Sequence, residues 1–219
     1  MKKIDHFPLI EIYGSPLNRG LQYGEQARAR IAASIDLYSR SLRDLGLSKS
    51  EILDLANNFI PKITDWAPDL VDEMKGIAKG ASVSLSEIML INARTEILQL
   101  AERGESFVDN HSDGCTGAII MPKLSANGEI IHGQNWDWNE ECINNTIVLR
   151  VLRDNGPNLL TFTEAGGLAR SGLNSAGISI TANYLKCDQD YKTLGIPLPF
   201  IRRRALECRY YSDAIRFVA

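Results

Sequence analysis

The hydrophobic pattern of this chain changes its period near residue 115, and this change limits the folds that the chain can adopt. Before that point apolar residues recur every three or four positions, which is typical of helices that bury one face. After it, short apolar runs alternate with turn sequences, which is typical of strands. Helices gathered in one part and strands in another favour an α+β fold.

The first half predicts one short strand followed by four helices. Gly46 and Gly80 are placed where helices commonly end, and Ser84 with Glu87 has the spacing of a capping box. Gly20 and Gly24 lie one turn apart inside a predicted helix, so we expect close packing against another backbone there. The expected strand is 9–13, and the expected helices are 18–45, 48–59 (capped by Ser48 or Ser50), 69–78 and a fourth from 84 onward.

The second half predicts mostly antiparallel strands, because short turns separate neighbouring runs. The turn over 126–128 should close a hairpin, and the turns over 154–157 and 174–177 should separate the later strands. The expected strands are 115–121, 129–134, 146–152, 159–163 and 177–183, and a helical pattern resumes from Pro199. The last residues, 215–219, are apolar without a cap, so we expect the chain to be part of a longer protein.

Between the two halves lies a polar stretch, 101–114, with no periodicity. Such stretches are typical of exposed loops, where chains are commonly cut. We expect one structural domain made of a helical segment over 1–114 and a strand-rich segment over 115–219.

Composition and charge exclude several classes of function. The chain has 44% hydrophobic residues, 23% charged residues and a net charge of −3, with no basic stripe for nucleic acid. No run is long enough to span a bilayer, and the N-terminus lacks a signal-peptide core, so we expect a cytoplasmic protein. The four cysteines form no CxxC pair, and with the three histidines they form no metal-ligand spacing, so we expect neither metal nor cofactor.

The junction Gly114-Cys115 carries the most specific chemistry. A thiol at the start of a strand can approach the preceding carbonyl, and Gly114 allows that approach because it has no Cβ. Attack on the Gly114 carbonyl and hydrolysis would leave Cys115 as a new N-terminus. Its α-amine, with a reference pKa of about 7.7–8.0, could then take the proton of its own thiol. By itself, a Gly-Cys pair more often marks a small buried thiol.

Two further residues complete the expected constellation. A hairpin turn at 126–128 would bring Asp137 to the same end of the sheet as Cys115, where its carboxylate could orient the thiol or the α-amine. Asn183 at a strand end could donate to an oxyanion, with the Tyr184 amide as a second donor. Taken alone, each would more often be a solvated turn residue. The thiols of Cys142, Cys187 and Cys208 are expected to be structural or surface groups.

Several motifs in consistent order resemble one known family. The chain is similar, from about Ile10 to its end, to the acyl-coenzyme A:6-aminopenicillanate acyltransferases, the peptidase C45 group. The motifs are Asp113-Gly114-Cys115-Thr116, Gly133-Gln134-Asn135-Trp136-Asp137, Thr163-Glu164-Ala165-Gly166, Asn174-Ser175-Ala176-Gly177, Arg19-Gly20, Tyr23-Gly24, 76–80 and 92–96.

The resemblance implies an N-terminal-nucleophile hydrolase fold, an αββα sandwich that would be incomplete over 1–219. It implies self-cleavage before Cys115 into an α and a β subunit, a thioester on Cys115, support from Asp137 and, by similarity to choloylglycine hydrolases, an oxyanion donor at Asn183. Acyl-coenzyme A would be a substrate rather than a cofactor. Gly117 and 140–142 depart from the fungal pattern, which puts penicillin chemistry in doubt. Alternatives are a bile-salt-type or ceramide-type N-acyl amide hydrolase, or a non-catalytic binding fragment.

Overall fold

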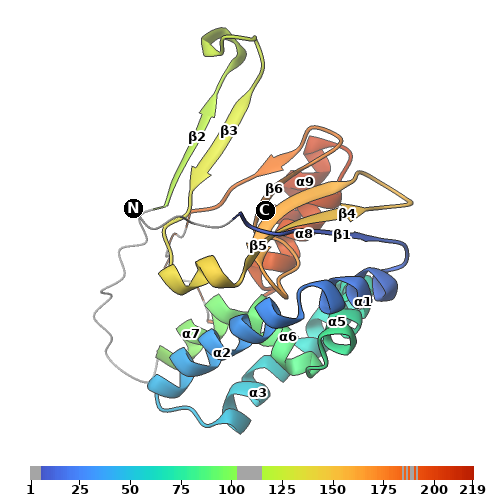
Figure 1. Ribbon diagram of the computed structural model, residues 1–219. Coiled ribbons are helices and arrows are strands. Elements are labelled where there is room, and N and C mark those ends of the chain that lie inside the picture. Colours follow the sequence, from blue (N-terminus) through green and yellow to red (C-terminus); the bar gives the residue numbers. More distant parts are fainter. Residues whose placement is uncertain (1–5, 103–114, 184, 186, 188–189, 191) are drawn as a thin grey trace.

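The computed structural model describes residues 6–102, 115–183, 185, 187, 190 and 192–219, and they form a mixed helical and sheet structure (Figure 1). The expected α+β class is therefore confirmed. The described helices of the first half are α1 (Pro16–Gln26), α2 (Arg28–Asp44), α3 (Lys49–Asn57), α4 (Ile60–Trp66), α5 (Pro68–Ala81), α6 (Leu85–Asn92) and α7 (Arg94–Glu102).

Two of the expected helices are each divided in two, so their prediction as single helices was wrong. The helix expected over 18–45 breaks at Ala27, whose φ of −108° lies outside the helical range, into α1 and α2. The break allows α1 to follow α5 while α2 turns its buried residues, including Ile31 and Tyr38, into the core. The helix begun by Ser84 breaks in the same way at Ala93, with a φ of −117°, into α6 and α7.

The other helix boundaries follow the local signals closely. The expected capping box forms at Ser84 with Glu87, and the cap expected at Ser48 or Ser50 is Ser48, which forms a second capping box with Glu51. Helix α5 continues past Gly80 to Ala81 and ends where Ser82 adopts a left-handed conformation with a φ of 61°. The short helix α4 had not been predicted.

Helices α1 and α5 are in backbone contact through four glycines. A Cβ built on Gly20 would lie 1.9 Å from the carbonyl oxygen of Glu73, and one on Gly24 would lie 2.3 Å from that of Ile77. The same holds from the side of α5. A Cβ built on Gly76 or Gly80 would lie 2.2 or 2.3 Å from a main-chain carbonyl oxygen of α1. The expected close packing at Gly20 and Gly24 is therefore confirmed, and any side chain at these positions would separate the helices.

The strands form a five-stranded sheet and a separate two-stranded hairpin. The order of the larger sheet is β1-β4-β5-β6-β7, with strands β1 (Leu9–Tyr13), β4 (Thr146–Leu152), β5 (Leu159–Glu164), β6 (Ser171–Asn174) and β7 (Ser179–Ile180). All its pairings are antiparallel except the one between β1 and β4, which is parallel. The strand expected over 177–183 shrinks to β7, and β6 had been missed, because its sequence lies next to a turn signal rather than in an alternating run.

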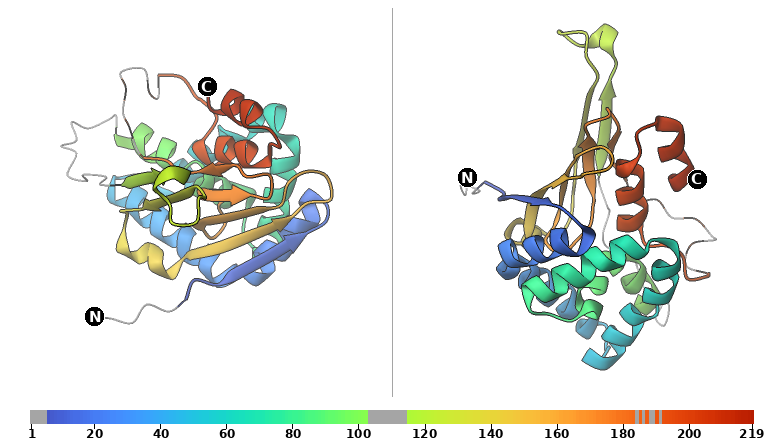
Figure 2. Two further views of the ribbon diagram at one scale, coloured as in Figure 1. Left: turned by 90° about the horizontal axis from the view of Figure 1, so that it is seen from above. Right: turned by 90° about the vertical axis from the view of Figure 1, so that its right-hand side faces the viewer.

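The larger sheet presents two different faces. Alternate residues of β4 and β5, namely Ile147, Leu149, Val151, Leu159, Thr161 and Thr163, are buried toward the helices. Helices α8 (Leu198–Glu207) and α9 (Tyr211–Val218) lie beside the β6 end, and α8 contacts β6 and β7 (Figure 2). The other face carries Val148, Leu160 and Phe162, which line a cleft.

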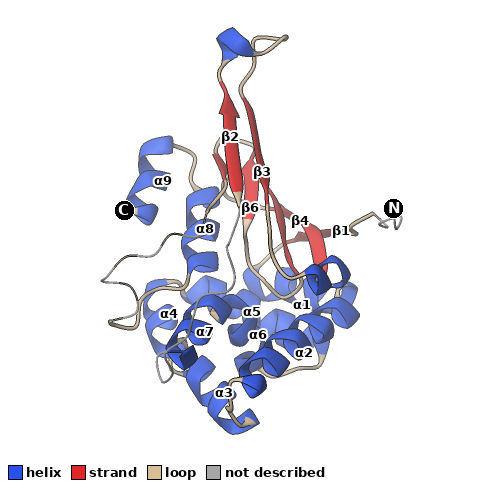
Figure 3. Ribbon diagram, turned by 90° about the vertical axis from the view of Figure 1, so that its left-hand side faces the viewer, coloured by secondary structure: helices blue, strands red, loops and turns tan. Residues whose placement is uncertain are grey.

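The hairpin of β2 (Thr116–Ile120) and β3 (Ile131–Asn135) extends away from the helices (Figures 1 and 3). Thr116 pairs with Asn135 and Ile120 with Ile131, which agrees with the antiparallel pairing expected for this segment. All five residues of β2 are exposed. No helix among the described residues is long and apolar enough to cross a membrane.

Candidate active site around Cys115

Cys115 lies immediately before β2, at the base of the hairpin, and is half-buried. Because Thr116 pairs with Asn135, the chain after β3 returns beside Cys115. The Sγ atom of Cys115 donates to the main-chain oxygen of Asp137 at 3.8 Å. The expected partner was the Asp137 carboxylate, whereas the contact found is with the backbone of the same residue. Gly114, the other half of the expected cleavage site, lies outside the described residues.

Asn183 lies on the other side of Cys115. Its Nδ2 atom donates to the main-chain oxygen of Cys115 at 3.0 Å. The three expected residues Cys115, Asp137 and Asn183 are thus brought together from three segments of the chain. Tyr184, whose amide was the expected second donor, lies outside the described residues.

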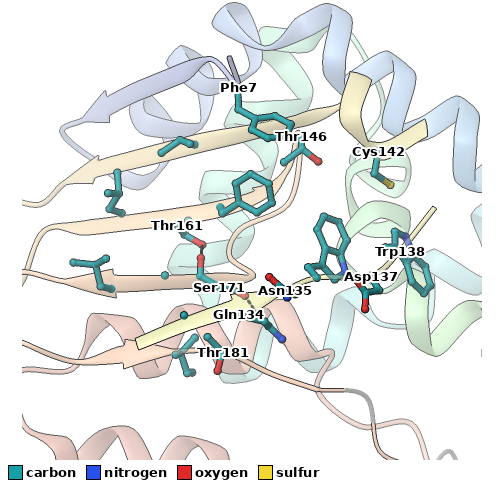
Figure 4. Close-up of a pocket in the computed structure, with 18 of the residues that line it drawn as sticks. Phe7, Gln134, Asn135, Asp137, Trp138, Cys142, Thr146, Thr161, Ser171 and Thr181 are labelled. Carbon is teal, nitrogen blue, oxygen red and sulfur yellow. Dashed lines mark hydrogen bonds between the residues drawn. The ribbon is translucent and has the colours of Figure 1, made fainter. Parts of the chain in front are cut away.

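Gln134 connects Asn183 to the larger sheet. Its Nε2 atom donates to the Oδ1 atom of Asn183 at 3.1 Å and to the main-chain oxygen of Ala182 at 2.7 Å. Its Oε1 atom accepts from the hydroxyl of Ser171 at 2.7 Å (Figure 4). Because Oδ1 of Asn183 accepts from Gln134, its Nδ2 must be the end directed at Cys115. Neither Gln134 nor Ser171 was singled out as a site residue.

Further polar contacts join the hairpin to β7 and to the residues that follow it. The two ring nitrogens of His132 lie 2.7 Å from the Ser179 hydroxyl and 2.9 Å from the Thr181 hydroxyl. Gly117 lies close to the same segment, since a Cβ built there would be in van der Waals contact with the Thr181 hydroxyl at 3.4 Å. His132 and Gln134 lie on one face of β3, two residues apart, and this spacing is the local signal that indicates their shared role.

Asp137 lies between two tryptophans that are held by different arginines. The guanidinium of Arg170 is stacked 3.7 Å from the ring centroid of Trp136, which also meets Phe162 edge to face at 6.1 Å. Trp138 donates through Nε1 to the Tyr38 hydroxyl at 3.2 Å, and the Arg94 guanidinium lies 5.5 Å from its ring. The main-chain course on both sides of Asp137 is therefore fixed.

Tyr38 belongs to a buried polar cluster with Arg94 and Glu164. Arg94 donates to both carboxylate oxygens of Glu164, at 3.0 and 3.1 Å, and through Nε to the Tyr38 hydroxyl at 2.7 Å. The Tyr38 hydroxyl in turn donates to Glu164. Burial acts to raise the pKa of the Glu164 carboxyl, but the charges of Arg94 and Arg170 outweigh it and hold that pKa below its usual range.

Burial also shifts the pKa values of two arginines near the site. Burial, together with the charge of Arg94, lowers the pKa of Arg170 to about 9. Burial and Arg94 likewise lower the pKa of Arg202 to about 10, and the Coulomb field of Cys115 is among the influences on it. The surroundings of Cys115 thus include several positively charged side chains, an arrangement suited to stabilising a developing negative charge.

The other cysteines and Asn174 have structural surroundings. Cys142 is buried 3.9 Å from the Tyr38 hydroxyl, and burial raises the pKa of its thiol to about 12. Cys208 is buried, whereas Cys187 is exposed. Asn174 donates to the carbonyls of Leu206 and Cys208, both at 2.8 Å, and so joins β6 to α8.

A cleft of about 810 Å³ separates the hairpin from the open face of the larger sheet (Figure 4). Asp137 and Trp138 line one side, and Val148, Leu160 and Phe162 line the other. Cys115 is not among its lining residues. Within the part of the chain that the structure describes, no group of three His, Cys, Asp or Glu side chains is placed to hold a metal ion.

Comparison with known proteins gives two informative relatives and no matching family model. The chain is 30% identical over 207 residues to the "Acyl-coenzyme A:6-aminopenicillanic-acid-acyltransferase 40 kDa form" of Emericella nidulans. The matched region covers 94% of this chain and 54% of that protein. It is 22% identical over 195 residues to an "Uncharacterized protein" of Archaeoglobus fulgidus, covering 78% of this chain and 32% of that protein. The chain therefore spans about half the length of the first relative and a third of the second.

Proposed function

Because the chain belongs to the family of the acyl-coenzyme A:6-aminopenicillanate acyltransferases, we propose that its protein is a self-processing acyltransferase or amide hydrolase with Cys115 as the nucleophile. The observation that carries this proposal is the convergence of three segments on one thiol. The main-chain oxygen of Asp137 lies 3.8 Å from its sulfur, and Asn183 donates to its main-chain oxygen at 3.0 Å.

In the first step Cys115 processes its own chain. The thiol attacks the Gly114 carbonyl carbon, its proton passes to the peptide nitrogen, and the C–N bond breaks to leave a thioester and the neutral α-amine of Cys115. Water then hydrolyses the resulting thioester and releases a carboxyl group on Gly114. Residues 1–114 become a helical α segment that stays with the β segment beginning at Cys115, and both remain parts of one structural domain.

In the second step the free α-amine serves as the base for its own thiol. It takes the thiol proton, and the thiolate attacks the carbonyl carbon of an acyl donor. The tetrahedral oxyanion needs hydrogen-bond donors, and we assign one of them to the Asn183 side-chain amide, whose Nδ2 donates one of its two hydrogens to the Cys115 carbonyl and has a second to offer. The leaving thiolate or amine recovers the proton, and an amine or water then attacks the thioester on Cys115.

The acyl donor is an acyl amide or an acyl-coenzyme A. The named relative acts, by its name, with acyl-coenzyme A and 6-aminopenicillanic acid. The shared chemistry requires only a carbonyl with a leaving thiolate or amine. We further propose that the larger sheet and the hairpin form part of an αββα sandwich, since the open face of the larger sheet carries apolar residues such as Leu160 and Leu173.

Mass spectrometry of the whole protein tests the first step. We expect two fragments that separate between Gly114 and Cys115, and a single uncut chain in Cys115→Ala. If the wild-type chain stays intact and inactive, the proposal fails and a non-catalytic binding role takes its place. If Cys115→Ala is cut and remains active, the proposal fails because another group is the nucleophile.

Incubation with an acyl-coenzyme A, with and without an amine acceptor, tests the second step. Release of coenzyme A that needs the amine indicates an acyltransferase. Cleavage of bile-salt-type or ceramide-type N-acyl amides without release of coenzyme A indicates an amide hydrolase. In either case the acyl group should be recovered on the peptide that begins with Cys115.

A further inference from the structure

We infer that Tyr38, supported by Arg94, is a positioning residue that fixes the Asp137 segment against Cys115 by holding the indole of Trp138. This inference rests on the proposed function, because Cys115 has to be the nucleophile for its surroundings to affect a rate. Both supporting residues come from the helical half, on α2 and α7, whereas Trp138 and Cys115 come from the strand-rich half.

The hydroxyl of Tyr38 has its hydrogen-bonding capacity filled. It accepts from Trp138 Nε1 at 3.2 Å and from Arg94 Nε at 2.7 Å, and it donates to Glu164. A hydroxyl has one donor and two acceptor positions, so these three bonds match its capacity, and the Cys142 sulfur at 3.9 Å is a more distant neighbour. Arg94 and Glu164 therefore set the direction of the hydroxyl, and of the two contacts left to it the shorter is with Trp138 Nε1, at 3.2 Å against 3.9 Å for the Cys142 sulfur.

Trp138 depends on that hydroxyl more than a core residue would. It is 38% exposed, whereas Tyr38 is 2%, Arg94 4% and Glu164 4% exposed. A partly exposed indole has few packing contacts to fix it, so its bond to a rigid buried hydroxyl decides where it lies. Arg94 also helps to hold Trp138 beside Tyr38, because its guanidinium lies 5.2 Å from the centroid of the Tyr38 ring and 5.5 Å from that of the Trp138 ring.

The position of Trp138 determines the position of Asp137. The two residues are adjacent, and Trp136 on the other side is already held by the Arg170 guanidinium at 3.7 Å. With both indoles fixed, the carbonyl of Asp137 has little freedom, and it is this carbonyl that lies 3.8 Å from the Cys115 sulfur. Release of Trp138 would free one side of Asp137 and let the thiol lose its partner.

Tyr38→Phe removes the hydroxyl alone, and Tyr23→Phe is its matched control. Tyr23 is also fully buried on a helix of the first half, and its hydroxyl also bonds across to the second half, donating to the Gly167 carbonyl at 3.1 Å and accepting from the Gly166 amide at 2.9 Å. Neither of those bonds reaches Trp138 or Asp137. A general effect of losing a buried hydroxyl should therefore appear in both variants.

The readout is the rate at which Cys115 of the processed whole protein is acylated by 4-nitrophenyl acetate. We expect kcat to fall about tenfold or more in Tyr38→Phe with KM within about twofold of wild type, because misplacement of a group by an ångström can cost up to about a hundredfold. Tyr23→Phe should keep kcat within about twofold. Wild-type kcat in Tyr38→Phe, or an equal loss in Tyr23→Phe, overturns the inference.

Trp138→Phe provides the same test from the exposed side, should Tyr38→Phe fail to fold. It removes the Nε1 donor and leaves the buried cluster intact, and we expect the same loss of kcat. A wild-type kcat in this variant overturns the inference as well.

Acrylamide quenching of Trp138, isolated by subtraction of the Trp138→Phe signal, separates this inference from the proposed function. We expect quenching to rise about twofold in Tyr38→Phe and to stay unchanged in Tyr23→Phe. If no Cys115-dependent acylation occurs even in wild type, the proposed function fails. Unchanged quenching in Tyr38→Phe would refute, independently of any activity, the claim that Tyr38 holds Trp138 in place.

Discussion

The side-chain amide of Asn183 donates to the main-chain oxygen of Cys115 across 3.0 Å, although the two residues lie far apart in the sequence. The opposite end of the same amide accepts from Gln134. An amide that is fixed at its acceptor end presents its donor in one direction only. Asn183 is thus oriented toward Cys115 before any substrate binds, which is the preorganisation that the proposed stabilisation of an oxyanion requires.

Gln134→Ala should lower the Cys115-dependent acylation rate by about ten- to a hundredfold, because Asn183 would lose the partner that fixes its orientation. His132→Ala is the control, since His132 lies two residues away on the same strand face and contacts Ser179 and Thr181 rather than Asn183. Its loss should be clearly smaller. Equal losses in the two variants would mean that only docking of the hairpin matters.

The four thiols should differ sharply in their reaction with iodoacetamide at pH 8. Alkylation requires the thiolate, and a thiol with a pKa of about 12 is ionised in only about one molecule in ten thousand at this pH. Cys142 should therefore remain unmodified in the native protein and react after unfolding, while the exposed Cys187 reacts in both states. Peptide mass mapping before and after addition of urea would measure this. Rapid native modification of Cys142 would contradict its burial.

Glu164→Gln should lower the free energy of unfolding at pH 7 by about 3–5 kcal/mol, because it leaves the buried guanidinium of Arg94 without its counter-charge. The pKa of Glu164 is lowered in the folded state, so its stabilising effect is complete above the unfolded value of about 4.3 and declines as the pH falls. Wild type and variant should therefore converge in acid.

Urea titrations at pH 7 and at successively lower pH would measure both free energies. Glu141→Gln, in the solvent-exposed pair with Arg40, is the control and should cause a much smaller loss. A difference between wild type and Glu164→Gln that does not change with pH would contradict the assigned ionisation.

Gly20→Ala should destabilise the protein strongly, because the new methyl group would lie 1.9 Å from the Glu73 carbonyl oxygen. The helices would have to separate, at a cost of about 3 kcal/mol or more, in the range of overpacked cores. Gly195→Ala is the control, as a Cβ there meets nothing within 4 Å. Thermal unfolding of the two variants beside wild type would measure the difference.

Local patterns in the sequence predicted the elements well and the connections between distant elements poorly. Strands β1 and β4 occupy their expected ranges because each is a short, mostly apolar run next to a turn sequence. Ser48 and Ser84 begin helices because a capping box is complete within four residues. The breaks at Ala27 and Ala93 escaped prediction because the apolar period continues through both, and only tertiary packing bends the chain there.

For the candidate site, too, local features could be predicted from the sequence and contacts between distant segments could not. Cys115 and Asp137 could be placed together from one hairpin turn, whose register follows from its sequence. The support by Gln134, Ser171 and Tyr38 could not be predicted, because it depends on contacts between segments separated by most of the chain. A polar residue on a strand or helix gives no sign of its partner until the fold is known.

The parallel pairing of β1 with β4 has a consequence for biosynthesis. Leu9 pairs with Val148, so the whole of the helical half and the hairpin emerge from the ribosome before β1 can meet its neighbour. Until then the main-chain groups of the first strand that bond to β4 lack those partners, and its buried residues Ile10 and Ile12 lack the cover of the sheet. Contacts of such sequence separation form slowly. The nascent chain therefore passes through a period in which its earliest strand is the segment most in need of protection by a chaperone.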